Sequence, residues 1–347
     1  MASSREEVGI SIGKRGNGDD SGSVMNKFAT LADRAKMGLF DPNLVQGEQF
    51  VQRAEKALRQ STLFSAFPKL EDCMYFYAKA AECFRRSKLW EEAGDCYHRV
   101  AENQKNAGNK HASAMAYVDC AEMYVRIHPL ESLVHYHAAI SVFAEIGRFM
   151  QAAKYQEIVA QLEEEQGEDL KAVHSYQQAA DYFIADGEHT VADRCLEKVA
   201  HICAYKEHYD RAAETFEALG MRCLQYNLRK FNAKTLFLRA GICQLCKKDF
   251  KAAQRIRRRH KDLDYTFASM AECRFLEDIG NNMKDGSFDD YMDHVYNFNN
   301  VNPLNVWELT MLDRIKKIIS GKEFARLDKE RKEREAWVEA NKKKKKK

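Results

Sequence analysis

A large side chain recurs about every twenty residues along most of this chain, and a small or aliphatic residue follows each one four positions later. Residues four positions apart lie on the same face of an α-helix. A large side chain that meets a small one lets neighbouring helices pack closely, and two such units span about forty residues, enough for two antiparallel helices and their loops. The pattern therefore predicts a stack of helix pairs, each packed on its neighbours. The large residues are Tyr77, Tyr97, Tyr117, Tyr136, Tyr155, Tyr176, Cys195, Phe216 and Phe237, and their partners are Ala81, Ala101, Ala121, Ile140, Val159, Ala180, Val199, Gly220 and Gly241.

The composition agrees with an all-helical chain. Only four of the 347 residues are proline, whereas the good helix formers Ala, Leu, Glu, Lys and Gln are abundant. No run of alternating polar and apolar residues indicates a strand, and no apolar stretch has the length of a membrane span. We expect an all-α fold, a TPR-like α-solenoid of antiparallel helix pairs with a C-terminal helical bundle that caps its last apolar face.

Local composition divides the chain into four segments. Residues 1–24 are rich in Gly, Ser and charge, and we expect them to be a disordered extension. The helical-repeat solenoid is expected over residues 25–250. The period fades after that point, so residues 251–321 form the expected helical cap, and residues 322–347 form a charged tail that is helical or disordered.

An apolar loop is expected near the beginning of the solenoid. Helices are expected at residues 25–36 and 45–60, and residues 61–69 follow as the loop. Two interpretations stay open: its large side chains fill the first groove of the solenoid, or they insert into a membrane interface or a partner. Full burial of one such side chain is worth about 1.5–3 kcal/mol, so three of them would give reversible attachment. These side chains are Leu63, Phe64 and Phe67.

Charge is distributed unevenly. The whole chain carries a net charge of +3, but residues 313–347 contain 15 basic and 7 acidic residues and so carry +8, which leaves −5 for residues 1–312. This division suggests an acidic partner or an anionic surface for the tail. A second basic run, residues 255–261, lacks the interleaved aromatic residues of many nucleic-acid-binding segments. We interpret that run as the solvent-exposed face of a helix.

No pattern indicates a reaction centre. The sequence lacks an HExxH motif, a phosphate-binding loop and a nucleophile elbow. Cys243 and Cys246 form a single CxxC with no second pair nearby, so we interpret them as core residues at helical spacing. His135 and His137 are two positions apart and do not share a helix face. We expect no catalytic residue, no metal and no cofactor. Most of the ten cysteines lie beside Ala and aromatic residues, as in the core of a reduced, cytosolic protein.

Several segments resemble one family, the soluble NSF attachment proteins, or SNAP adaptors, and they are closer to the alpha type than to the gamma type. The similarity runs in order along residues 44–321. Each segment alone is weak evidence for the family, but six segments in the family's order are strong evidence together. The segments are AAECF at 80–84 with WEEAG at 90–94, EIGRF at 145–149 with AAK at 152–154, SYQQAADY at 175–182, CLEKVA at 195–200, FNAK at 231–234 with FLRA at 237–240, and LTMLDRIKK at 309–317.

The resemblance implies a function. Such adaptors wrap a four-helix SNARE bundle and recruit the hexameric AAA ATPase called N-ethylmaleimide-sensitive factor, which pulls the bundle apart during vesicle trafficking. The adaptor itself hydrolyses nothing. Basic residues on the inner face of the solenoid would hold the acidic bundle through many weak contacts. By position within the matching segments, the implied SNARE-binding residues are Arg148, Lys154, Arg194, Lys198, Lys230, Lys234 and Arg239.

The resemblance also implies contacts at both ends of the chain. The family carries a membrane-contact loop before its first repeat, which here falls on the three apolar residues of segment 61–69. It also carries a C-terminal leucine that contacts the ATPase, for which Leu327 is the candidate. Family members typically end soon after the equivalent of Gly321, whereas this chain continues into a basic tail. Two interpretations of lysines 342–347 stay open: they contact anionic lipid, at about 1 kcal/mol for each residue near the surface, or they have no function. The implied location is cytoplasmic and peripheral on the cytosolic face of membranes.

Two other functions compete with this one. A generic TPR-like scaffold would bind short peptides as a chaperone or complex-assembly adaptor, but peptide-binding TPR arrays repeat every thirty-four residues and not every forty. A nucleic-acid-binding role for the basic tail would require retention on RNA. We expect the SNARE adaptor, with no nucleic-acid partner.

Overall fold

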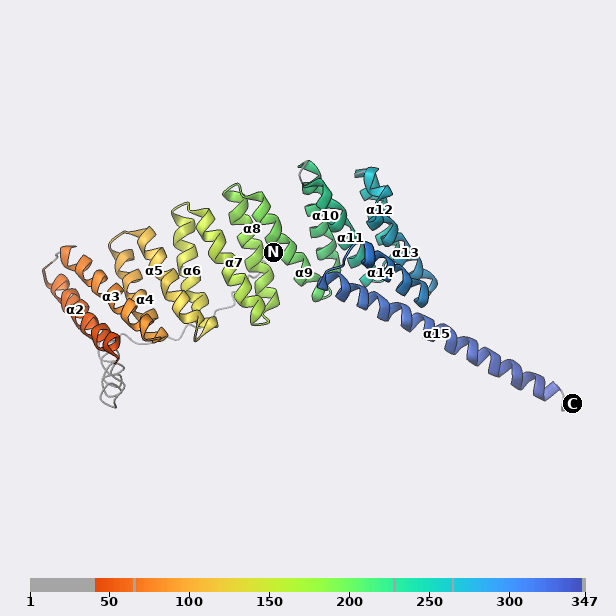
Figure 1. Cartoon of the computed structure of the whole chain (residues 1–347), viewed down its shortest axis with the longest axis horizontal. Coiled ribbons are helices and arrows are strands. Elements are labelled where there is room, and N and C mark those ends of the chain that lie inside the picture. Colours follow the sequence, from red (N-terminus) through yellow and green to blue (C-terminus); the bar gives the residue numbers. More distant parts are fainter. Residues whose placement is uncertain (1–40, 65–66, 227–228, 264, 345–347) are drawn as a thin grey trace, which may run out of the picture. The chain divides into compact units, whose positions relative to one another are not determined.

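Every regular element in the described part of the chain is helical, as expected from the sequence (Figure 1). The elements are fourteen α-helices, labelled α2 to α15, and one short 3-10 helix, η1. None of the described helices is long and apolar enough to cross a bilayer. The expected disordered segment 1–24 and the expected helix at 25–36 lie outside the described residues. The computed structural model describes residues 41–64, 67–226, 229–263 and 265–344.

The chain forms two compact units, Met1–Val142 and Phe143–Lys347, which we describe separately. The boundary between them falls near the end of α6. The domain boundaries that we expect after residues 24, 250 and 321 remain predictions.

Unit 1 is a stack of antiparallel helices in which each helix packs against the next one along the chain. Helix α2 packs on α3, α3 on α4, and α4 on α5. Helix α2 begins with Pro42, a residue favoured in the first turn of a helix because it has no N–H to leave unpaired. The bounds are Pro42–Phe64 for α2, Phe67–Arg86 for α3, Trp90–Asn106 for α4, Lys110–Val125 for α5 and Pro129–Glu145 for α6.

Unit 2 has the same kind of stacking from α7 to α11 and ends in a helical bundle. Helix α11 packs on α10 and also contacts α12, α13 and α15, while α14 packs on α13 and α15. This bundle is the expected cap over the last repeat. The bounds are Phe149–Glu165 for α7, Asp169–Ala185 for α8, His189–Tyr205 for α9, Tyr209–Gln225 for α10, Lys230–Cys246 for α11, Phe250–Leu263 for α12, Tyr265–Ser269 for η1, Ala271–Asp285 for α13, Phe288–Val301 for α14 and Val306–Lys344 for α15.

The twenty-residue period corresponds to one helix and one turn. Helices α7 to α11 have 17 residues each, and three-residue turns such as 166–168 join the helices from α7 to α10. The second turn residue adopts the left-handed conformation, as at Gly167 with φ +77°, where glycine is favourable because it has no Cβ. The same turn position holds Lys88, Glu207 and Lys248, each with positive φ, at a cost of about 1–2 kcal/mol apiece.

The pairing of large and small side chains forms the core. All nine small or aliphatic partners are buried, and so are seven of the nine large residues, with Tyr97 and Tyr155 partly exposed. At Gly220 a Cβ would lie 2.4 Å from the ring of Phe237 on the next helix, so a side chain there would collide with the ring. Glycine at that position therefore permits the close helix packing that the pattern predicted.

The cysteines are core residues, as the sequence indicated. All ten are free and buried. Cys243 and Cys246 lie on α11, and the thiol of Cys246 donates a hydrogen bond to the carbonyl of Met311 at 3.4 Å. Burial raises the pKa of Cys246 to about 12, so its thiol is protonated at neutral pH.

The prediction for the basic run 255–261 is only partly right. Arg255, Arg258 and Arg259 are exposed on α12, as expected. In contrast, Arg257 and His260 are buried. Arg257 forms an ion pair with Glu277 of α13, and the Nε2 atom of His260 lies 2.9 Å from a carboxylate oxygen of Glu217 on α10. Two of the seven residues of this run therefore face the core, because α12 packs against its neighbours on that side.

Candidate functional site

The seven basic residues singled out in the sequence all lie in unit 2, on three alternate helices. Arg148 is the N-cap residue of α7, and Lys154 lies one turn inside that helix. Arg194 and Lys198 share one face of α9, since they are four positions apart. The remaining three residues, Lys230, Lys234 and Arg239, lie on α11.

Two ion pairs show that these three helices lie side by side. The Nζ atom of Lys198 on α9 is 3.2 Å from a carboxylate oxygen of Glu164 on α7. Arg239 on α11 pairs in the same way with Glu197 on α9. In a stack of antiparallel helices every second helix belongs to the same layer, so the predicted residues occupy one layer of unit 2. We refer to α7, α9 and α11 as the odd layer.

The side chains of the odd layer differ in how available their charges are. Arg148, Lys154, Arg194 and Lys230 are exposed. None of these four forms an ion pair with another described residue. Lys198 is half exposed and holds Glu164 at 3.2 Å, so its charge is partly neutralised within the chain. An acidic partner can therefore contact these four cations without first breaking an ion pair within the chain.

Lys234 is held inside the structure. Its Nζ atom lies 2.7 Å from the buried carboxylate of Glu272 on α13 and 4.0 Å from the ring centroid of Phe231. The side chain of Lys234 is 15% exposed. A cation in this position neutralises Glu272, and contact with a partner would compete with that pairing.

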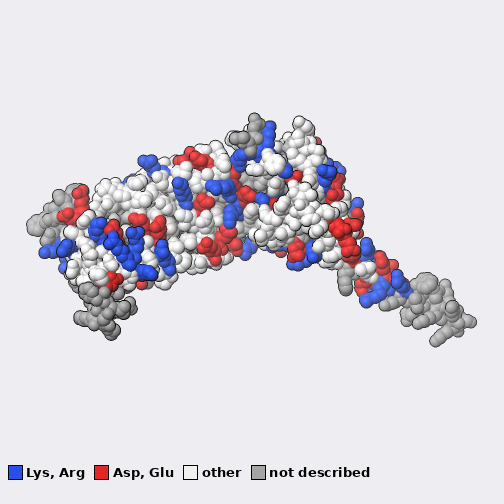
Figure 2. Space-filling view, in the orientation of Figure 1, with Lys and Arg blue, Asp and Glu red and all other residues white. Residues whose placement is uncertain are grey.

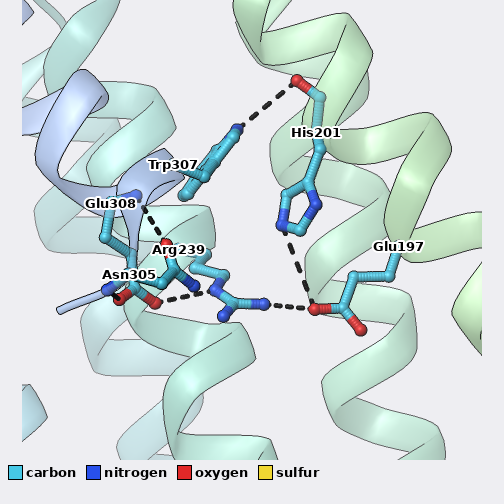
Figure 3. A network of polar contacts seen from close by, with 6 residues as sticks. All are labelled: Glu197, His201, Arg239, Asn305, Trp307 and Glu308. Carbon is cyan, nitrogen blue, oxygen red and sulfur yellow. Dashed lines mark hydrogen bonds and ion pairs between the residues drawn. The ribbon is translucent and has the colours of Figure 1, made fainter. Parts of the chain in front are cut away.

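Arg239 is the most buried of the seven, at 9% exposure. Its Nε donates to Glu308 of α15 at 2.9 Å, and its Nη1 donates to Glu197 of α9. Figure 3 shows the guanidinium between the two carboxylates, so this side chain joins the odd layer to the long C-terminal helix. Its charge is neutralised within the chain by Glu197 and Glu308.

Glu308 has a second function at the beginning of α15. Its backbone N–H donates to Oδ1 of Asn305 at 2.8 Å, while its own carboxylate accepts from the backbone N–H of Asn305 at 3.0 Å (Figure 3). This reciprocal pair is a capping box, which satisfies two N–H groups that a helix start would leave unpaired. The Asn-x-x-Glu spacing is the sequence signal that predicts such a cap.

A neutral histidine completes this network. His201 packs against Phe216 and Trp307, which also contact each other, and the indole N–H of Trp307 donates to the His201 carbonyl at 3.4 Å. Burial, with smaller contributions from Arg239 and Lys198, lowers the pKa of His201 to about 3. The imidazole is thus uncharged at neutral pH, and its 3.9 Å approach to Glu197 is not an ion pair there.

Asp193 is a second buried carboxylate that sequence analysis missed. One of its oxygens lies 2.7 Å from Arg222 of α10, and the other lies 2.6 Å from Arg229 in the connection that follows. The side chain of Asp193 is only 6% exposed. The hydrogen bond to Asp193 raises the pKa of Arg229 against the opposing effect of burial. No local motif predicts this cluster, because its members are joined only by the packing of α9 on α10.

The comparisons with known proteins identify a family. The family model described as "Soluble NSF attachment protein, SNAP" matches residues 45–320. The chain belongs to the SNAP family. It is 33% identical to the alpha-soluble NSF attachment protein of Vitis vinifera, over 81% of this chain and 97% of that protein. It is 30% identical to the human alpha-soluble NSF attachment protein, over 81% and 94%, and 27% identical to that of Saccharomyces cerevisiae, over 79% and 97%.

The SNAP-family match confirms the resemblance read from the sequence. It includes α3 to α14 completely, together with most of α2 and the beginning of α15. Residues 1–44 and 321–347 lie outside the match. The basic residues of the odd layer lie within it, whereas the candidate ATPase contact Leu327 does not.

The apolar loop of this SNAP-family chain is shorter than expected. Leu63 and Phe64 belong to the last turn of α2, and Phe67 is the first residue of α3. The predicted loop at 61–69 is therefore wrong in extent, because both helices continue into it, and only residues 65 and 66 separate them. Both of those residues lie outside the described part.

The C-terminal segment is a continuation of the last helix of the cap. Helix α15 runs for 39 residues without a break. Its first part is packed into the bundle through Met311, Ile315 and Ile319. Farther along, Leu327 is 52% exposed. Figure 2 shows Lys and Arg interspersed with Asp and Glu on the projecting part, and pairs such as Lys332–Asp328 at 2.8 Å support the exposed helix.

Proposed function

We propose that this chain is a non-catalytic adaptor that binds assembled SNARE complexes and recruits the hexameric AAA ATPase N-ethylmaleimide-sensitive factor for their disassembly. The observation that carries the proposal is the SNAP-family match over residues 45–320. The odd layer of unit 2 supports it, because exposed cations on three neighbouring helices suit a long acidic rod.

The affinity for the SNARE bundle would come from several weak contacts. One exposed ion pair contributes about 0.2–1 kcal/mol. Arg148, Lys154, Arg194 and Lys230 are exposed, and together they would supply about 1–4 kcal/mol, with Lys198 adding to this when it leaves Glu164. The remaining two predicted residues, Lys234 and Arg239, would act mainly by holding α11 in place. Affinity that depends on surface charge falls as salt screens it.

Membrane association and ATPase contact extend this proposal to the two ends of the chain. Leu63, Phe64 and Phe67, at the junction of α2 and α3, would contact the membrane reversibly from the cytosolic side. Lysines 342–347 would add attraction to anionic lipid. Leu327 is exposed on α15 and is the candidate contact for the ATPase.

A disassembly assay tests the adaptor function. The full-length chain, assembled SNARE bundle, the ATPase and ATP are combined, and release of a labelled SNARE helix is followed. We expect release above a no-adaptor control, together with retention of the ATPase on immobilised bundles. No retention and no release would reject the proposal. Binding of an extended peptide, without binding of the folded bundle, would support the generic scaffold instead.

Two truncations separate the functions of the ends. A chain that stops after Leu327 keeps the candidate ATPase contact and loses the rest of the tail, so disassembly should persist while binding to anionic liposomes falls. Deletion of residues 342–347 alone should weaken liposome binding by at least about tenfold, since each lysine near such a surface contributes about 1 kcal/mol. Unchanged liposome binding would remove the tail from the membrane contact.

A further inference from the structure

Three potential metal ligands meet inside unit 1. They are His98 of α4, Cys120 of α5 and His135 of α6. One ligand atom from each residue, a ring nitrogen or the sulfur, lies within 4.8 Å of the others. Cys120 is fully buried, while the two histidines are partly exposed. The partial exposure of the two imidazoles would give an ion access to the cluster.

One atom of this cluster lacks a partner. The Nδ1 atom of His98 is buried and makes no hydrogen bond to any described residue. A buried polar atom left unpaired costs about 1–3 kcal/mol, which an ion bound at Nδ1 would offset. The ring of His98 is held edge-on to His135 at 5.3 Å between centroids, and Tyr124 stacks on His135 at 5.1 Å. The neighbouring aromatic ring restricts the orientation of His135.

A carboxylate, Asp95, lies three positions before His98 on α4. The hydroxyl of Tyr124 donates to Oδ1 of Asp95 at 2.7 Å, which holds that side chain on the same part of α4 as His98. Tyr124 reaches it because Gly94 has no side chain: a Cβ there would lie 2.6 Å from the tyrosine ring. One thiolate and one nearby carboxylate would together balance the charge of a divalent cation in a partly buried site.

The ligand types limit which ions fit the site. Two imidazoles and one thiolate form a borderline-soft set that suits zinc, which takes four ligands in a tetrahedron and is often bound by three protein ligands and one water. Tetrahedral ligands at about 2.0–2.3 Å from zinc lie about 3.3–3.6 Å from one another. Side-chain movements of about 1 Å would bring the present atoms to these separations.

We propose that His98, Cys120 and His135 bind one zinc ion, with the fourth position open to water. On binding, the Cys120 S–H bond is replaced by an S–Zn bond and the proton is released to solvent, without any change in oxidation state. The ion would connect three consecutive helices of unit 1. It would act as a structural clip, independent of the odd layer in unit 2.

Cobalt(II) gives a direct readout of such a site. The reduced, metal-free full-length protein is titrated with Co²⁺, which in a tetrahedral site with a thiolate shows a near-ultraviolet sulfur-to-metal band and intense visible bands. We expect saturation at one ion per chain and displacement by Zn²⁺. We also expect the thermal midpoint to rise with Zn²⁺, since a ligand that binds only the folded state stabilises it. Absence of both bands at saturating Co²⁺ would overturn the proposal.

Matched variants assign the ligands. Cys120→Ser and His135→Gln should each weaken metal binding more than about 100-fold, and Asp95→Asn should weaken it less, because Asp95 is hydrogen-bonded to Tyr124 and would act on the ion only through its charge. His137→Gln on the same helix and Cys203→Ser in unit 2 are the controls, and both should bind like the parent. Retention of the near-ultraviolet band in Cys120→Ser, or its loss in Cys203→Ser, would place the metal elsewhere and reject the site.

One variant tests the site even if His135→Gln fails to fold. His135→Cys replaces one ligand with another that zinc accepts, so the metal-bound form should still assemble. Its cobalt complex should show a stronger near-ultraviolet band, because two thiolates contribute. A band no stronger than that of the parent would show that residue 135 is not a ligand.

Discussion

Arg239 on α11 and Glu308 on α15 are 69 positions apart in the sequence and are joined by a buried hydrogen bond of 2.9 Å. Removing one member of such a pair leaves the other charge buried and uncompensated, at a typical cost of about 3–5 kcal/mol. We therefore expect Arg239→Met to lower the stability of unit 2 by about this amount. Urea unfolding followed by helical circular dichroism measures it.

Two further variants show whether the pair itself is responsible. Arg239→Met combined with Glu308→Met removes both charges, so the double variant should recover much of the loss, apart from about 1 kcal/mol for the capping box. Lys317→Met breaks only the exposed pair with Asp313 and should cost less than about 1 kcal/mol. An equal cost for Arg239→Met and Lys317→Met would contradict a buried pair.

Stability should fall on acidification because of His201. Its folded-state pKa of about 3 lies below the ordinary value of 6.5, so below about pH 6.5 the unfolded chain binds a proton that the folded chain does not. The lost stability is about 2 kcal/mol at pH 5 and grows as the pH falls toward the folded-state pKa. The charged groups that face His201 are Glu197, Arg239 and Lys198.

His201→Phe removes this source of pH dependence while keeping a ring beside Trp307. Between pH 7 and pH 5, the free energy of unfolding should fall by about 2 kcal/mol less in the variant than in the parent. Urea unfolding at both pH values measures this difference. Some dependence should remain, because burial also lowers the pKa of His260 despite the opposing effect of Glu217. His137→Gln, at an exposed position, should follow the parent curve. Parallel curves for His201→Phe and the parent would refute this assignment.

Much of the fold is local and could therefore be predicted from the sequence. A 17-residue helix and a three-residue turn together produce the twenty-residue period, and pairs such as Tyr176 and Ala180 lie one helical turn apart. The turn glycines mark the left-handed positions directly, as at Gly167. Single-sequence patterns report such relationships well because both residues belong to one element.

The relationships that the sequence did not reveal join different elements. Asp193 meets Arg222 and Arg229 only because α9 packs on α10 in one register. His135 was compared with its neighbour His137, whereas its spatial neighbours are on α4 and α5. Family motifs located Arg239 but could not indicate that its charge is already used by Glu308. Such pairings depend on how helices are rotated against one another, which no local pattern encodes.

Glycine on the packing faces gives a steric prediction. Gly220→Ala should lower stability by about 1–3 kcal/mol, because the new Cβ would lie 2.4 Å from the ring of Phe237. That ring is fully buried and stacks on His260 at 3.9 Å, so it has little room to move. Gly321→Ala on α15 meets nothing within 4 Å and should raise helix stability by about 0.5–1 kcal/mol. Thermal unfolding should show a lower midpoint for Gly220→Ala than for the parent and a higher one for Gly321→Ala. An unchanged midpoint for Gly220→Ala would disprove close packing at this contact.

Charge reversal separates binding from folding in the odd layer. Lys154→Glu combined with Arg194→Glu changes two exposed cations on α7 and α9, so it should weaken SNARE-bundle binding roughly tenfold at 0.1 M salt. The difference should shrink at 1 M salt, where the screening length is only about 3 Å. Stability should change by less than about 0.5 kcal/mol, as is usual for surface substitutions.

The matched control for this variant is Lys171→Glu on α8, an exposed cation of the other layer that is paired with Glu168 in its own turn. Its affinity for the bundle should stay within about twofold of the parent, because a rim charge outside the contact contributes little. Titrations of labelled bundle at 0.1 M and 1 M salt measure both variants. Equal weakening by Lys171→Glu would mean that overall charge determines binding, and the odd layer would no longer be identified as the binding face.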